Sequence, residues 1–166
     1  MDEQEQTAIA ALRARGLDLV LNAQERRAWQ DGFNNLPAMK IYGARVDLED
    51  PRLVRLTLPL IEPHHQGGLG GEAVNGAVIS GLFDCAVGVA GLHQLPGKRT
   101  GTIELSIKLL RPAKTAPLIF YAVATKKNAT LAFVECQLFC SGQLCSHCTG
   151  LVAASSTLEG TPFEEK

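Results

Sequence analysis

The feature that most constrains this chain is the segment from Gly76 to Leu92, which has seventeen residues, no proline and one charge, Asp84. As a helix it would be roughly 25 Å long at a rise of about 1.5 Å per residue. That length is at the short limit of a membrane span, which takes about 17 to 25 apolar residues. Four glycines and a carboxylate argue against a span, and half-polar segments flank it. We therefore expect a central helix buried inside a globular domain and no membrane association.

The segments around this helix alternate apolar and polar residues, which is typical of strands with one buried face. The alternation is clearest over residues 102–109. Upstream, residues 44–48 and 54–58 predict a hairpin that turns at Asp50-Pro51. Downstream, three more strands are expected, separated by short connectors that suit antiparallel neighbours: 117–125, 130–140 and 143–154. This order predicts an α+β domain in which a curved antiparallel sheet wraps one long central helix.

The first part of the chain has a different pattern. Residues 2–15 and 23–33 are rich in helix-forming residues, and Gly32 to Pro37 contains signals that end a helix. We expect an N-terminal helical extension over residues 1–35, the sheet-and-helix domain over 36–155 and a C-terminal tail over 156–166. A chain of 166 residues suits one main domain.

Charge excludes some partners. The formal net charge is −1, and no cluster of Lys and Arg is present, so nucleic acid is not an expected partner. The acidic start, MDEQEQ, lacks the basic and then apolar pattern of a secretory signal, so we expect a cytoplasmic protein. The five cysteines are then expected to be reduced thiols.

Four cysteines and a histidine between residues 136 and 148 invite comparison with a zinc site. Only Cys145 and Cys148 form a C-x-x-C pair, and no second pair accompanies it. We favour small buried residues in strands and expect no metal, with a zinc or redox site as the alternative.

The glycine cluster at residues 67–71 precedes the helix and could form a phosphate cradle. Such a cradle requires a strand, a tight turn and a helix within a βαβ unit. The alternating strands that follow the helix predict an antiparallel sheet instead. A dinucleotide-binding fold is therefore disfavoured.

Asp84 and the helix start together suggest chemistry. A lone carboxylate on an apolar helix must be paired or be held for a reaction. Free amides at Asn75, Gly76 and Ala77 would present the positive end of the helix dipole to a developing oxyanion. Gly76 and Asp84 are roughly 12 Å apart along one helix, so two subunits that meet antiparallel would have to share a site.

At this point the residues resemble the PaaI-like hotdog-fold acyl-CoA thioesterases, over about residues 36–155. In that family His-Gly-Gly opens the central helix, and an Asp follows nine residues after the His. Here Asn75-Gly76-Ala77 stands at the same place, Asp84 is nine residues after Asn75, and the strand that follows runs into Pro112. The resemblance implies a hotdog fold and a homodimer or homotetramer.

The resemblance also implies hydrolysis of an acyl-CoA thioester to the free acid and CoA, with no cofactor beyond the CoA of the substrate. Gly76 would donate its N–H to the thioester carbonyl, and Asp84 of the other subunit would act as general base or nucleophile. Asn75 would assist, and Thr102 would help to place the water. Expected contacts to the substrate are Gln66, His65, Ala77, Phe83 and Arg111.

The chain departs from the family at three positions. Asn75 replaces the His and also suits a helix N-cap, Ala77 replaces the second Gly, and Leu69 falls where relatives have an Asn that orients the carbonyl. Gln66 or His65 would then take over that role. One alternative is an acyl-CoA-binding hotdog module without turnover, in which Asp84 is an inert structural partner.

Two other chemistries are also open. A hotdog hydratase or dehydratase would need a catalytic His at a matching motif, and none is visible. Cys85 as a nucleophile has no His at a motif spacing, and a buried thiol is the commoner state of such a residue.

Overall fold

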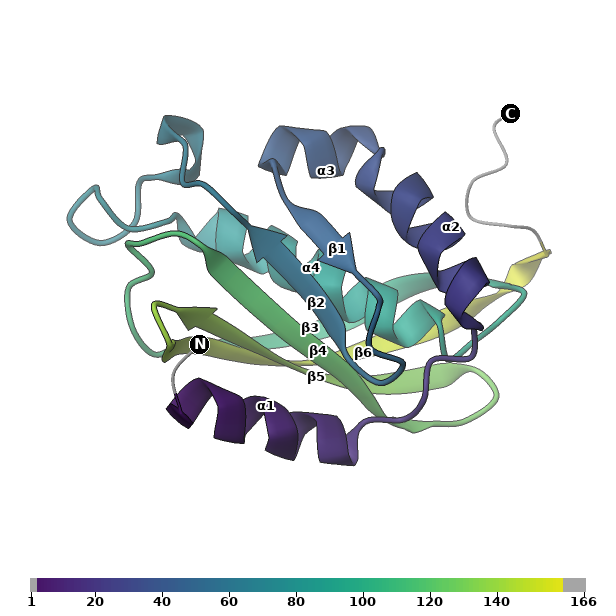
Figure 1. Ribbon diagram of the computed structural model, residues 1–166. Helices are drawn as coiled ribbons and strands as arrows, with labels where there is room; N and C mark the ends of the chain where they lie inside the picture. Colours follow the sequence, from purple (N-terminus) through teal and green to yellow (C-terminus); the bar gives the residue numbers. More distant parts are fainter. Residues whose placement is uncertain (1–2, 160–166) are drawn as a thin grey trace.

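The computed structural model describes residues 3–159 and shows one antiparallel sheet around a central helix (Figure 1). The sheet has six strands in the order β1-β2-β4-β5-β6-β3, and every neighbouring pair is antiparallel. The expected α+β class and the curved sheet are confirmed. The elements are α1 (Glu3–Arg15), α2 (Ala23–Asn34), α3 (Pro37–Tyr42), β1 (Arg45–Asp47), β2 (Val54–Leu58), the 3-10 helix η1 (Pro63–His65), α4 (Gly76–Leu92), β3 (Lys98–Leu109), β4 (Leu118–Lys127), β5 (Leu131–Cys140) and β6 (Gln143–Glu159).

Helix α4 begins and ends where the sequence predicts and packs in the hollow of the sheet. Its buried face is aliphatic and aromatic, and Phe83 meets Phe120 of β4 edge to face, with ring centroids 5.0 Å apart. The opposite face is open in part, because Ala77 and Asp84 are exposed and Gly88 is half-buried, whereas the Tyr42 side chain lies against Gly81. The expected central helix is therefore buried on one face only within one chain. Within residues 3–159 no helix is long and apolar enough to cross a membrane.

The N-terminal helices cover two further parts of the sheet. Helix α1 lies on the face opposite α4 (Figure 1), where Leu12 is fully buried beside Tyr121, Val123 and Phe139. Helix α2 lies along β1, and the Asn34 side chain both accepts from the Val46 N–H (2.7 Å) and donates to the Val46 carbonyl (2.9 Å). Such contacts occupy backbone groups that an edge strand leaves unpaired.

The other edge of the sheet is different. Strand β3 pairs with β6 on one side only, and no described element covers its outer side. Most of its side chains are exposed or half-buried, and Ile103 is among the exposed large apolar residues. An open edge of this length is a template for pairing with another chain.

The structure differs from the sequence-based expectation in two segments of the chain. Helix α3 was not expected, because Pro37 was interpreted as the end of the helical region, whereas it occupies the first turn of a new helix, a position that proline tolerates. At the other end β6 reaches Glu159, and residues 160–166 of the expected tail lie outside the described residues.

Candidate active site

The start of α4 presents unpaired backbone donors. Asn75 is the N-cap, as its sequence position suggests, and its side-chain oxygen accepts from the Ala77 N–H at 2.8 Å. The Asn75 carbonyl accepts from the Ile79 N–H at 3.1 Å. Among the described residues no acceptor is found for the N–H groups of Gly76 and Val78. The first turn of a helix leaves such donors free for an anionic ligand.

The glycine-rich loop before α4 is folded back on itself. Gln66 and Val74 form an antiparallel bridge, and the Gly68 N–H donates to the Ala73 carbonyl at 2.9 Å. A Cβ at Gly68 would lie 2.7 Å from the Val74 carbonyl oxygen, so this close approach requires glycine. The loop thereby brings the exposed Gln66 close to the helix start.

His65 is an internal support of the loop. Its ring is buried, its Nδ1 accepts from the Glu62 N–H at 2.9 Å, and its carbonyl accepts from the Asn75 N–H at 2.8 Å. Burial lowers the pKa of His65, and the adjacent His64 adds to this effect. A neutral ring that accepts at Nδ1 carries its proton on Nε2. The buried His65 therefore helps to fix the start of α4, through the hydrogen bond from the Asn75 N–H to its carbonyl.

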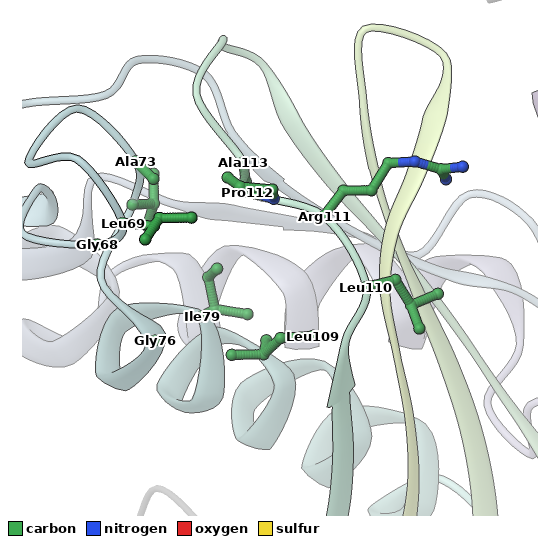
Figure 2. Close-up of a pocket in the computed structure, with 11 residues that line it drawn as sticks. Gly68, Leu69, Ala73, Gly76, Ile79, Leu109, Leu110, Arg111, Pro112 and Ala113 are labelled. Carbon is green, nitrogen blue, oxygen red and sulfur yellow. The ribbon is translucent and has the colours of Figure 1, made fainter.

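A cavity of ≈ 340 Å³ opens beside Gly76 (Figure 2). Its wall comes from the glycine-rich loop, the first turn of α4 and the segment that follows β3, and it is mostly apolar: Leu69, Val74, Ile79, Leu109, Pro112 and Ala113. Arg111 also lines it, but its guanidinium points away from the cavity in Figure 2 and donates to the Leu144 carbonyl at 2.9 Å. The sequence analysis missed this wall, for which Pro112 at the strand end was the available signal.

Asp84 lies on the open face of α4, about 12 Å along the axis from Gly76. It makes no hydrogen bond or ion pair with any described residue. Asp84 is at the middle of α4, and Thr102 of β3 lies about one turn further along, since its Oγ1 is 3.6 Å from the place where a Cβ on Gly88 would be. One chain thus places the amide and cavity at the start of α4, and the carboxylate and hydroxyl in its middle and second half.

The two remaining residues that were expected to contact the substrate, Ala77 and Phe83, lie in different surroundings. Ala77 is exposed on the open face of α4, next to the free amides, although its own N–H is used by the cap. Phe83 is fully buried in the core and does not line the cavity.

Cysteine chemistry finds little support in the geometry. Burial, followed by the charge of Asp84, raises the pKa of Cys85 to about 11, so its thiol stays protonated near neutral pH. Cys136 and Cys148 are opposite one another on β5 and β6, and both are buried free thiols. Within residues 3–159 no group of three His, Cys, Asp or Glu side chains is placed to hold a metal.

Comparison with known proteins agrees with this geometry. Residues 71–146 match the sequence model of the thioesterase superfamily, and this range contains α4, β3, β4, β5 and the first residues of β6. The chain has the hotdog fold of the thioesterase superfamily. The resemblance to PaaI-like hotdog thioesterases is therefore confirmed. Comparison with curated proteins gave no significant match.

Three solved structures illustrate the similarity. A thioesterase family protein from Silicibacter pomeroyi is 26% identical, with 78% of this chain and 95% of that chain covered and a TM-score of 0.66. A Shewanella oneidensis protein related to the thioesterase superfamily is 16% identical, covers 80% and 97%, and has a TM-score of 0.71. The E. coli PaaI protein from the phenylacetic acid degradation operon is 14% identical, covers 83% and 96%, and has a TM-score of 0.67.

Proposed function

We propose that this protein hydrolyses acyl-CoA thioesters to a free acid and CoA. The observation that carries the proposal is the Gly76 N–H, which has no acceptor among the described residues and borders an apolar cavity. The superfamily match over residues 71–146 supports the reaction class. An unpaired carboxylate on the same helix, Asp84, supplies the second group that hydrolysis requires.

In the proposed reaction the thioester carbonyl oxygen accepts from Gly76 N–H at the positive end of α4. Asp84 of the partner subunit takes a proton from water as the water oxygen attacks the carbonyl carbon. The C–S bond then breaks, and that proton passes to the thiolate of CoA. In the nucleophilic variant the carboxylate itself attacks the carbonyl carbon, and the C–S bond breaks to release the thiolate of CoA. Water then hydrolyses the resulting anhydride to the free acid, and a proton from that water passes to the thiolate as the Asp84 carboxylate is regenerated. Thr102, which lies about one turn beyond Asp84 along α4, would help to hold the water.

The proposed assembly follows from the separation along α4. Two helices that meet antiparallel through their open faces would bring Gly76 of one subunit towards Asp84 of the other, twice per dimer. The small residues Ala77 and Gly88 on that face permit a close approach, whereas the Tyr42 side chain of the same chain already lies against Gly81. The open edge of β3 lies beside this face and offers backbone pairing, whereas α2 covers the edge at β1. We propose a homodimer as the active unit, and a homotetramer would be built from it.

A second candidate is an acyl-CoA-binding module without turnover. Asn75 favours it, because its side-chain oxygen is engaged in capping Ala77 and is not directed at a ligand by any contact. In that case Asp84 would be a structural partner across the dimer.

The substitution Asp84→Asn tests the hydrolytic proposal. We expect kcat to fall about 100-fold or more, because a positioned general base typically contributes that much, with thiol release from hexanoyl-CoA as the measurement. Asp31→Asn, an exposed acid on α2, is the matched control and should keep full activity. Unchanged turnover in the Asp84 variant would refute the mechanism, and tight binding without thiol release by the wild type would support the binding module.

A further inference from the structure

The cavity beside Gly76 is bounded by exposed apolar side chains. Leu69 is 77% exposed, and Leu109 and Leu110 are each more than half exposed. All three line this cavity, although they come from the glycine-rich loop and from the end of β3 (Figure 2). Large apolar side chains that gather at a hollow indicate a binding surface for an apolar ligand.

Several backbone N–H groups of the wall already have partners. The Val74 N–H donates to the Ala113 carbonyl (2.8 Å), and the Gly68 N–H donates to the Ala73 carbonyl (2.9 Å). The N–H groups of Leu110 and Arg111 both donate to the Cys145 carbonyl. With the Arg111 guanidinium turned towards Leu144, no side-chain charge of the wall faces the hollow. A ligand group placed here would find apolar contact and, at the edge of the hollow, the free Gly76 amide.

We propose that this cavity binds the acyl group of the substrate, that it selects uncharged, apolar acyl groups, and that Leu69 contributes to this selectivity. The inference rests on the proposed function. A cavity of ≈ 340 Å³ is at the small end of ligand pockets, which span about 300–1,000 Å³, and therefore suits a short acyl group. A carboxylated acyl group would lose its hydration without gaining a partner.

The pantetheine arm of CoA fits this cavity less well than the acyl group does. Its amides would need hydrogen-bond partners, and the backbone groups named above are already paired with one another. An apolar acyl group has one polar atom, its thioester carbonyl oxygen, and the Gly76 N–H would supply the hydrogen bond to it.

Leu69 is the wall residue best suited to a test. It lies between Gly68 and Gly70 on the loop that the Gln66–Val74 bridge closes, and its side chain is outside the core clusters. Its substitution therefore removes apolar contact with a ligand without opening a void in the core. Leu60, which is 64% exposed and does not line the cavity, is a matched control.

The experiment compares hexanoyl-CoA with succinyl-CoA, whose acyl groups have equal numbers of non-hydrogen atoms, and uses acetyl-CoA as a short reference. For the wild type we expect kcat/KM to be more than tenfold higher for hexanoyl-CoA than for succinyl-CoA. Leu69→Ala should lower the ratio of hexanoyl to acetyl kcat/KM about three- to tenfold. Leu60→Ala should leave that ratio unchanged. Equal rates with both seven-atom acyl groups, or the same response in both variants, would overturn the inference.

A measurement of binding tests this inference independently of the hydrolytic proposal. If no CoA ester releases thiol, calorimetry with hexanoyl-CoA and succinyl-CoA still reports on the cavity. A preference for hexanoyl-CoA that Leu69→Ala weakens would support the apolar site while hydrolysis fails. Equal affinities for the two esters would overturn the site itself.

Discussion

At the scale of single residues, the Gly76 amide can be removed with little other change. Gly76 is the first residue of α4, where proline is tolerated, and Asn75 has φ −62° and ψ 138°, which suits a residue before proline. Gly76→Pro should therefore keep the fold, with the free energy of unfolding altered by less than about 1 kcal/mol, and lower kcat about 100- to 1,000-fold. Thiol release and urea unfolding measure the two quantities.

Gly76→Ala is the control, because it retains the N–H and its Cβ would lie 3.6 Å from Leu109, an ordinary contact. Mixing the Gly76→Pro and Asp84→Asn subunits adds a test of the shared site. Each mixed dimer would regain one intact site, so activity should return to about a quarter of the wild-type value after random exchange. No recovery in a mixture shown to contain mixed dimers would contradict a site built from two subunits.

Sequence reasoning located the helix start and Asp84 correctly in the chain but misjudged the surroundings of Asp84. Glycine, alanine and serine fit an open face as well as a buried one, so the apolar count of α4 did not reveal that Asp84 is exposed. The cavity wall was also out of reach. Leu69 and Ala113 meet there only because backbone hydrogen bonds fold the loop back, and no periodicity encodes such contacts.

At the scale of elements, α1 is attached to the sheet chiefly by burial. Leu12 is fully buried beside Val123 and Phe139, whereas the ion pair of Arg13 with Asp50 is partly exposed and contributes little. Leu12→Ala should lower the free energy of unfolding by about 2–3 kcal/mol, the lower part of the range for buried leucines. Urea unfolding gives the value, and a loss of less than about 1 kcal/mol would show that α1 is only loosely attached. Val20→Ala, at a largely exposed position, should cost less than about 0.5 kcal/mol.

The strands were predictable because an apolar face that packs on the core imposes a period of two that survives in the sequence, although β4 is buried on both faces and β3 has no fully buried side chain. Helix α3 was not, since six residues are too few to show a helical period and Pro37 can end one helix or begin the next. The order of strands in the sheet was also beyond reach. The pairing of β3 with β6 joins residues about fifty positions apart, which local patterns do not record.

At the scale of the whole molecule, the extension and the sheet domain share one core. Trp29 and Phe33 of α2 pack against that core, and Trp29 meets the ring of His93, just after α4, with centroids 4.5 Å apart. His93 is 3% exposed. Burial, with a further contribution from the charge of Arg26, lowers the pKa of His93 to about 4. The contact between the extension and α4 therefore depends on a neutral ring.

This dependence predicts the effect of pH on stability. An unfolded histidine has a pKa of about 6.5, so between pH 6.5 and about 4 the unfolded chain binds more protons than the folded one, and the free energy of unfolding falls as pH falls. His93 should contribute a loss of about 2–3 kcal/mol between pH 7.5 and 4.5, and His65, whose pKa is also lowered, acts in the same direction. Urea unfolding at both pH values measures the total change. His93→Gln should reduce that change; parallel pH dependences for the wild type and His93→Gln would show that protonation of His93 does not set the stability of the contact.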